Sequence, residues 1–417
     1  MGPTIIFDKS FLQSLSVDES VFFEQFFLSN ITLLFYVETL GDLDLVQHKS
    51  GKPITKVISE LATKTPLNGA APNVHHSRLV LGSLVGIDVE MDGRIIRDGG
   101  VEKIDPDGNV GIFYDESPEE LALKRWHDQD YFEVEKLFSQ EWRKSLSNLT
   151  FDYVLGIVKN IVPGGTQLSN PTQINNFVNN FISTTKPELL LYLITELSGL
   201  PKNYYLKSLD RWNNNNYSNF EVFAPYASFV LRIELFFYIC MLKGFESKQR
   251  PSHKIDLAYL FYLPFCNVFV SNDKLHKRVA PFFLRSDQIL VDGENLKKGL
   301  AQLNVYYEQY SSQITEKGLL SFASQPPQDL ENEVSKIWDQ VFPNWRKSKS
   351  NNGVDRNLDK DKKLLEHLKK VQKESITTSR NTPMDKVHHI MTTHRVPVNK
   401  GKWRILPKGI EDKITTE

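Results

Sequence analysis

The feature that most constrains the fold is an alternation of short apolar runs with helical patterns, which occurs in two blocks far apart in the chain. The first block covers residues 1–45, where the run Thr4-Ile5-Ile6-Phe7 predicts a buried strand. The second block covers residues 223–310. Strands that alternate with helices are typical of a parallel sheet. We expect both blocks to share one sheet, because neither alone offers enough strands to bury its apolar runs.

Within these blocks the sequence predicts particular elements. Ser16 and Glu19 form a capping-box pattern that begins a helix with phenylalanines on one face. Further strands are expected at 31–37, 266–270 and 288–291, and further helices at 223–244, from about Lys254, at 275–284 and at 294–310.

The segment between the blocks has a different character. Residues 46–222 read as an inserted α+β domain, mostly helical, with β-structure at 79–114 and turn dipeptides at Asp92-Gly93 and Asp107-Gly108. Residues 311–350 read as a connector. Residues 351–417 read as a charged helix followed by a flexible basic tail.

The net charge of −1 conceals an uneven distribution. Residues 346–417 carry 18 Lys and Arg against 9 Asp and Glu, which leaves 32 against 42 in the rest of the chain. Two cysteines exclude a disulfide framework and a Cys-based zinc finger. The most apolar segment, 223–245, contains charged residues and predicts a buried helix rather than a membrane span. No signal-peptide pattern opens the sequence, so we expect a soluble, cytoplasmic protein.

Four acidic residues lie at predicted strand ends and helix starts, the positions where a parallel sheet usually binds its ligands. Asp8 ends the first strand, Glu38 opens the helix after the second, Asp256 lies in the first turn of a helix, and Asp273 follows the strand at 266–270. Ligands bind at the carboxyl ends of parallel strands. Crowded carboxylates repel one another unless a cation compensates them, and Mg²⁺ or Mn²⁺ would do so. Each acid alone is equally consistent with a helix cap.

These residues and their surroundings resemble the PIN domain, a fold of metal-dependent nucleases. The similar stretches are Thr-Ile-Ile-Phe-Asp8-Lys-Ser, Tyr-Val-Glu38-Thr-Leu, Lys-Ile-Asp256-Leu-Ala-Tyr-Leu and Val-Phe-Val-Ser-Asn-Asp273-Lys. The resemblance covers residues 1–45 and 223–310. It implies a PIN-like three-layer domain with a central parallel sheet, split by a large insertion.

The resemblance also implies an activity. Asp8, Glu38, Asp256 and Asp273 would bind Mg²⁺ or Mn²⁺, and Asp42, one helical turn beyond Glu38, would be an extra or substitute ligand. Ser271 and Asn272 would orient Asp273 or contact the water shell. The expected activity is hydrolysis of phosphodiester bonds by an endoribonuclease acting on single-stranded RNA.

Basic residues near the acids are candidates for binding a nucleic-acid backbone. They are Lys9, Lys274, Lys277 and Arg278, with His276 beside them, and Ser271 and Asn272 are candidates for the same contact. For Lys274, His276, Lys277 and Arg278 the alternative is a solvated helix face. The basic tail, with Trp403, suits contact with phosphate and stacking on a base, or is a solubilising tail.

Other functions remain open from the sequence. One is a non-catalytic interaction protein with an acidic rim, because the acidic body repels nucleic acid. Another is a DNA-acting nuclease or a toxin-type defence component controlled by a regulatory protein partner. No membrane partner is expected.

Overall fold

The computed structural model describes residues 2–66, 70–148, 151–163, 166–246, 253–347, 370–371, 373–378, 382–392 and 396–408. The charged helix predicted at the start of the segment 351–417, over residues 355–373, lies almost wholly outside these residues.

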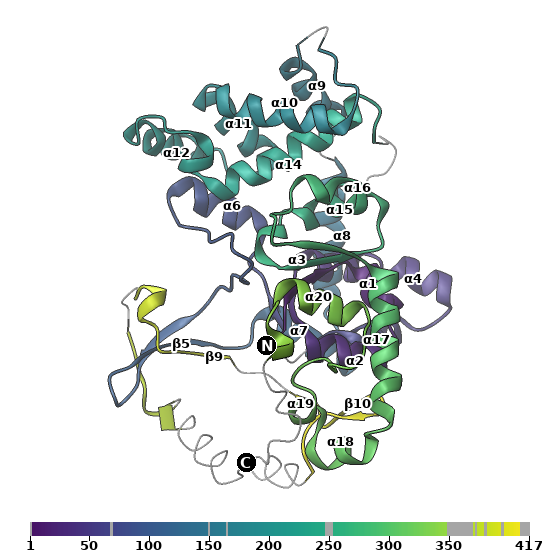
Figure 1. Ribbon diagram of the computed structural model, residues 1–417. Coiled ribbons are helices and arrows are strands. Elements are labelled where there is room, and N and C mark those ends of the chain that lie inside the picture. Colours follow the sequence, from purple (N-terminus) through teal and green to yellow (C-terminus); the bar gives the residue numbers. More distant parts are fainter. Residues whose placement is uncertain are drawn as a thin grey trace.

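A five-stranded parallel sheet forms the centre of the molecule (Figure 1). Its spatial order is β3 (Ala70–Pro72), β2 (Leu28–Ile31), β1 (Thr4–Phe7), β6 (Val268–Ser271) and β7 (Ile289–Asp292). β1 pairs with β2 on one side and with β6 on the other, both in parallel. The prediction that residues 1–45 and 223–310 share one parallel sheet is therefore confirmed, and the chain has an α/β fold. β3 was not expected, because it comes from the segment assigned to the insertion.

Alternate residues of the strands supply two hydrophobic cores, one on each face of the sheet. Ile5 and Phe7 of β1 belong to one core, together with Val268 and Val270 of β6. Ile6 belongs to the other core, with its register partner Phe269. Successive side chains of a strand point to opposite faces, so a buried four-residue strand serves both layers.

The first core is covered by helices from residues 9–127 and by a later helix, residues 293–308. They are α1 (Lys9–Ser14), α2 (Val17–Phe26), α3 (Leu33–Gly41), α5 (Ile54–Lys64), α7 (Pro118–His127) and α17 (Gly293–Glu308), with α4 (Leu43–Ser50) between α3 and α5. The predicted capping box of α2 is confirmed, since Ser16 accepts from the Glu19 N–H and Glu19 accepts from the Ser16 N–H. Phe22, Phe23 and Phe26 are fully buried against this face of the sheet.

The strand predicted at 31–37 is wrong in its position. β2 ends at Ile31, Thr32 is the N-cap of α3, and the apolar run that follows is helical. Leu34 packs into one core and Phe35 into the other, which a short helix at the edge of the sheet permits. A short apolar run does not distinguish a strand from a buried helix by periodicity alone.

The second core continues into a helical region built around α14 (Pro225–Leu242). Its other helices are α6 (His76–Val85), α9 (Phe151–Ile161), α10 (Pro171–Thr184), α11 (Pro187–Leu197), α12 (Asn203–Asn214), α13 (Phe220–Phe223), α15 (His253–Leu260) and α16 (Lys274–Val279), with η1 (Leu263–Phe265) and η2 (Ala280–Phe282). α14 is long and apolar enough to cross a membrane, but 83% of its apolar window is buried by the protein. It is the buried helix that the sequence predicts.

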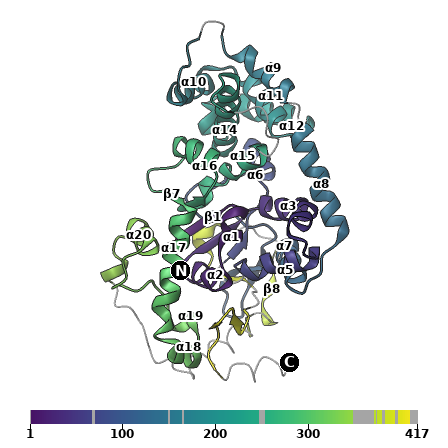
Figure 2. The ribbon, with the colours of Figure 1, turned by 90° about the vertical axis from the view of Figure 1, so that its right-hand side faces the viewer.

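The long helix α8 (Glu133–Asn148) runs along one side of the molecule, from the level of α7 to that of α12 (Figure 2). The β-structure predicted at 79–114 is wrong at its start, because residues 76–85 form α6. Its second half is correct: β4 (Val101–Ile104) and β5 (Val110–Tyr114) form an antiparallel hairpin around Asp107-Gly108.

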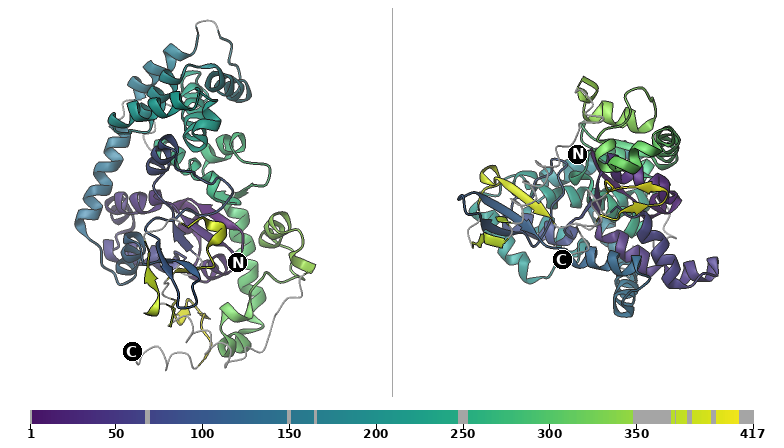
Figure 3. Two further views of the ribbon diagram at one scale, coloured as in Figure 1. Left: turned by 90° about the vertical axis from the view of Figure 1, so that its left-hand side faces the viewer. Right: turned by 90° about the horizontal axis from the view of Figure 1, so that it is seen from below.

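A second sheet unites this hairpin with strands from the predicted tail. Its order is β8 (Ile376–Thr377), β4, β5 and β9 (His389–Thr392), with η4 (Met384–Lys386) between the tail strands. Seen from below, the hairpin and the tail strands lie together at one side of the body (Figure 3). The tail is thus anchored to the segment assigned to the insertion.

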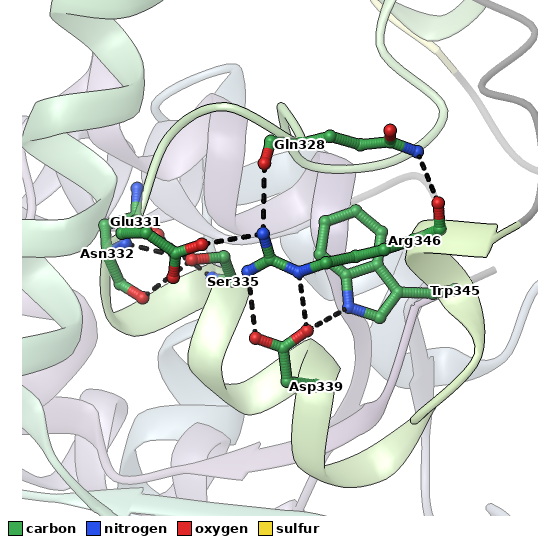
Figure 4. Close-up of polar contacts among 7 residues, drawn as sticks. All are labelled: Gln328, Glu331, Asn332, Ser335, Asp339, Trp345 and Arg346. Carbon is green, nitrogen blue, oxygen red and sulfur yellow. Dashed lines mark hydrogen bonds and ion pairs between the residues drawn. The ribbon is translucent and has the colours of Figure 1, made fainter.

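The connector predicted at 311–350 is a packed part of the first core. It contains α18 (Ser311–Lys317), α19 (Leu319–Phe322), α20 (Glu333–Val341) and η3 (Trp345–Lys347). Arg346, in η3, forms bonds to residues earlier in the same segment (Figure 4). Its guanidinium group donates to both carboxylate oxygens of Asp339, at 2.7 and 2.8 Å, and to Glu331 at 2.7 Å, and Trp345 donates to Asp339 as well. These charge-assisted bonds raise the pKa of Arg346 and lower that of Asp339.

The prediction of a flexible tail is wrong for residues 396–408. β10 (Asn399–Lys400) and β11 (Trp403–Arg404) form an antiparallel pair that packs on α2 and α18. Trp403 is buried with an edge-on contact to Phe22, and its indole N–H donates to Asn304 at 2.9 Å. Trp403 and Ile405 are large buried apolar side chains that hold this segment on the body, although the tail as a whole has few such residues.

The lysines of this segment pair with acids of the body. Lys400 contacts Glu24 at 2.6 Å, Lys402 contacts Glu308, and Lys408 contacts Glu316 at 3.4 Å. The basic tail and the acidic body therefore neutralise each other in part within the molecule. Where these pairs form, the tail lysines are already paired with carboxylates rather than available to phosphate.

Candidate acidic site at the sheet edge

Asp8 stands at the carboxyl end of β1 and is only 6% exposed. It is the N-cap of α1 and accepts from the backbone N–H of Phe11 and from the hydroxyl of Ser10, both at 2.7 Å. The hydroxyl of Ser271 donates to its other oxygen. This contact follows from the register, because Phe7 pairs with Val270 and the next residues of the two strands are Asp8 and Ser271.

Ser271 and His276 connect Asp8 to the helix that carries Asp256. His276 is buried, and its Nδ1 lies 2.7 Å from the Ser271 hydroxyl and 3.8 Å from a carboxylate oxygen of Asp8. Its Nε2 lies 2.7 Å from the backbone carbonyl of Asp256, which only accepts, so Nε2 donates. His276 therefore fixes the first turn of α15 beside β6. It is buried, so the alternative that it lies on a solvated helix face is wrong.

Glu38 reaches the same place from α3. The hydroxyl of Tyr259, a fully buried residue of α15, donates to Glu38 Oε2 at 2.5 Å. Burial raises the pKa of Tyr259 well above its ordinary value, and the negative charges of Glu38, Asp8 and Asp256 raise it further. The charges of three of the four predicted acids therefore act on one phenol, which contacts Glu38 directly. The sequence analysis missed Tyr259.

The Glu38 carboxylate is in an unfavourable environment. Burial raises its pKa, and the charges of Asp42 and Asp8 act in the same direction. Lys9 and the hydrogen bond from Tyr259 lower it again without cancelling the effect of burial. Glu38 lies in the middle of α3 rather than at the start of a helix as expected, because β2 ends earlier.

Lys9 lies beside this carboxylate. Its ammonium group forms an ion pair with Asp42 and donates to the backbone carbonyl of Glu38 at 3.1 Å. The Lys9 side chain is 10% exposed. Lys9 was predicted to bind nucleic acid and Asp42 to bind metal, and in this structure the two contact each other.

The fourth predicted acid, Asp273, is tied to the site through its backbone. Its N–H donates to the Ser271 hydroxyl at 2.9 Å, and its carboxylate accepts from the Leu275 N–H at 2.6 Å as the N-cap of α16. Asn272 accepts from the Glu294 N–H at 3.1 Å and so faces the start of α17.

The basic residues predicted beside Asp273 lie on α16. Lys277 pairs with Asp292, and Arg278 forms two bonds to Glu246 at 2.6 and 2.8 Å. Lys274 is exposed. Two of these three cations are therefore engaged with carboxylates of the protein.

The donor set at the sheet edge consists of hard carboxylate oxygens, the ligands that Mg²⁺ and Mn²⁺ prefer. Within the described residues, however, no three His, Cys, Asp or Glu side chains are arranged so that they hold a metal ion as they stand. Comparison of the chain with protein-family models, with curated proteins and with solved structures finds no match.

Replacement of Glu38 by Gln is expected to raise the melting temperature at neutral pH in EDTA by a few degrees. A carboxyl whose pKa is raised by folding destabilises the folded state once the pH exceeds that pKa, and this cost disappears below the ordinary pKa of glutamate. Melting curves measured from pH 3.5 to 8 should therefore converge at the acidic end. A difference that is constant over this range would contradict the expectation.

Proposed function

We propose that this chain is a divalent-metal-dependent endonuclease with a PIN-like domain, and that it hydrolyses phosphodiester bonds of single-stranded RNA. The observation that carries the proposal is the hydrogen bond from Tyr259 to Glu38 close to Asp8 at the carboxyl end of β1, with the charges of Glu38, Asp8 and Asp256 all raising the pKa of the Tyr259 hydroxyl. Asp256 lies more than 200 residues from Asp8 and Glu38 in the sequence, so the fold brings two distant segments together here. The preference for RNA rests on the sequence resemblance alone.

The burial of Asp8 and the raised pKa of Glu38 support the metal. A bound Mg²⁺ or Mn²⁺ ion would stabilise ionised Glu38 and supply an activated water and charge stabilisation for a phosphodiester. The protein's own groups would hold the ligands in place. Three donors fix the Asp8 carboxylate, Tyr259 fixes Glu38, and His276 fixes the helix turn that carries Asp256.

One observation favours a second function, that of a non-catalytic interaction protein. Lys9 already compensates part of the negative charge, through its ion pair with Asp42. An acidic edge that contains its own cation is compatible with a purely structural role.

Calorimetric titration of Mn²⁺ into protein stripped with EDTA separates the two functions. We expect the wild type to bind Mn²⁺ and Asp8→Asn to bind it at least about tenfold more weakly, since one ligand charge is lost. Asp105→Asn is a matched control, because Asp105 is also 6% exposed and also caps a turn, in the β4–β5 hairpin. Absence of binding by the wild type would favour the interaction protein.

A further inference from the structure

The helix α8 presents a polar side to the body of the protein and an apolar side to the solvent. On the body side, Lys136 contacts Asp44 of α4 at 2.7 Å, and Gln140 donates to the same carboxylate at 2.9 Å. Glu135 forms an ion pair with Arg125 of α7. Their spacing places these three α8 residues on one side of the helix. Polar contacts therefore hold α8 against the body.

The opposite side of α8 carries an apolar stripe, which we define as Phe132, directly before the helix, with Val134, Leu137 and Phe138. These four side chains are between 50% and 68% exposed. A surface helix ordinarily turns its apolar side to the core, so α8 has the reverse arrangement. An exposed apolar patch with polar surroundings marks an interaction site. The helix runs along one side of the molecule, where a partner can reach it (Figure 2).

The charges beside the apolar stripe are mostly acidic. Residues 128–141 contain five acids and one lysine. That lysine, Lys136, is 11% exposed and is bound to Asp44, whereas Asp128 and Glu133 are exposed. The surface presented to a partner over this range is therefore apolar with an acidic border.

The acidic border ends within α8. Arg143 and Lys144 follow in the sequence of the helix, and their side chains lie outside the described residues. The surface considered is therefore limited to residues 128–141, which cover the turn before α8 and its first half.

We propose that the apolar stripe and its acidic border bind an amphipathic helix of a partner protein, one that carries large apolar residues on one face and Lys or Arg beside them. The apolar face of the partner would pack on Val134, Leu137 and Phe138, as helices that recognise a surface through residues three and four positions apart do. Its cations would lie beside Asp128 and Glu133. The inference goes beyond the proposed function and does not depend on it.

The charge of the border favours this partner over two others. A second copy of the chain would bring the same acidic border to the interface, because a twofold interface uses one patch on both subunits. A membrane surface that contains anionic lipids would repel the same acids. A helix with cations beside its apolar face is instead attracted by them, since opposite charges across an interface favour association.

The test uses the full chain and two synthetic helical peptides of about 18 residues, or five turns. One consists of leucine and lysine, the other of leucine and glutamate, and both have their leucines on one face. We expect fluorescence anisotropy to show that the wild type binds the leucine–lysine peptide at least about tenfold more tightly than the leucine–glutamate peptide at low salt. Added salt should reduce this difference, because it screens exposed charges.

Leu137→Ser combined with Phe138→Ser removes the centre of the stripe. We expect at least about tenfold weaker binding of the leucine–lysine peptide, because a few large side chains carry most of the binding energy of an interface. Both residues are more than half exposed, so the melting temperature should stay near that of the wild type. Leu206→Ser combined with Val305→Ser is the matched control. These residues are 64% and 66% exposed and lie on α12 and α17, so binding should not change.

Glu133→Lys tests the border separately from the stripe. It should weaken binding of the leucine–lysine peptide and strengthen binding of the leucine–glutamate peptide, because it reverses one charge beside the stripe.

Two results of the peptide titration would overturn the inference. One is the absence of binding of the leucine–lysine peptide by the wild type, and the other is equal binding by the Leu137→Ser, Phe138→Ser variant. Sedimentation velocity and flotation with vesicles of phosphatidylcholine and phosphatidylserine examine the other two partners. A wild-type dimer or vesicle-bound protein that this variant loses would assign the stripe to a second copy or to a membrane, and would also overturn the inference.

Discussion

Replacement of Asp8 by Asn is expected to reduce Mn²⁺-dependent cleavage of single-stranded RNA by at least about 10²-fold, the loss typical of removing a group that stabilises charge in a transition state. Asn is nearly isosteric with Asp, and its carbonyl oxygen still accepts from Phe11 and Ser10. The fold should therefore persist. Repulsion within the cluster also falls, so stability in EDTA should equal or exceed that of the wild type.

The measurement pairs a cleavage assay with thermal melting in EDTA and in Mn²⁺. Mn²⁺ should raise the melting temperature of the wild type, because only the folded state assembles the site. That increment should shrink in Asp8→Asn and persist in the control Asp105→Asn. Full cleavage by Asp8→Asn would leave Asp8 as a helix cap, since Asn caps a helix about as well as Asp.

Replacement of Trp403 by Ala is expected to destabilise the folded protein by about 3–5 kcal/mol, the range for truncation of a large buried aromatic side chain. Trp403 is 3% exposed and contacts Phe22 of α2, with ring centroids 5.3 Å apart. The change leaves a cavity between the tail and the first core, and it leaves Asn304 without its indole donor. A clearly lower melting temperature by circular dichroism should report the loss.

Two control variants distinguish the loss of packing at Trp403 from the effect of an arbitrary substitution in the tail. Trp403→Phe keeps an aromatic ring but loses the hydrogen bond, so a smaller loss is expected, about 1 kcal/mol for the hydrogen bond plus a packing contribution. Lys408→Ala removes a lysine whose side chain is 64% exposed and should change stability by less than about 0.5 kcal/mol. If Trp403→Ala melts at the wild-type temperature, the packed position of residues 396–408 is wrong.

The composition of the tail gave little indication of this packing. Residues 346–417 have few large apolar side chains for their length, and disorder is the ordinary expectation for such a segment. A single tryptophan and a neighbouring isoleucine nevertheless bury against α2 and α18, and the second sheet receives β8 and β9 from the same tail. Contacts of this kind depend on a partner surface elsewhere in the chain, so composition does not reveal them.

Local signals in the sequence named the candidate acids but not all the residues that contact them. Asp8 and Asp256 were singled out because strand ends and helix starts are readable from apolar runs and caps, whereas Glu38 was expected at a helix start and lies in the middle of α3. Tyr259 was missed and the role of His276 was not expected, because an aromatic residue in an apolar helix and a histidine among lysines are ordinary core and surface patterns. Their roles arise from hydrogen bonds to residues 221 and 20 positions away.

The sequence by itself determined the strands β1, β6 and β7, the capping box of α2, the buried helix α14 and the position of Asp8 at the end of β1, because each depends on patterns within about 20 residues. Only the tertiary structure decided the rest. It placed β3 from the middle of the chain in the central sheet, packed residues 311–347 and 396–408 on the first core, and paired Lys9 with Asp42. Such choices depend on which distant surfaces and charges meet, and local periodicity does not encode them.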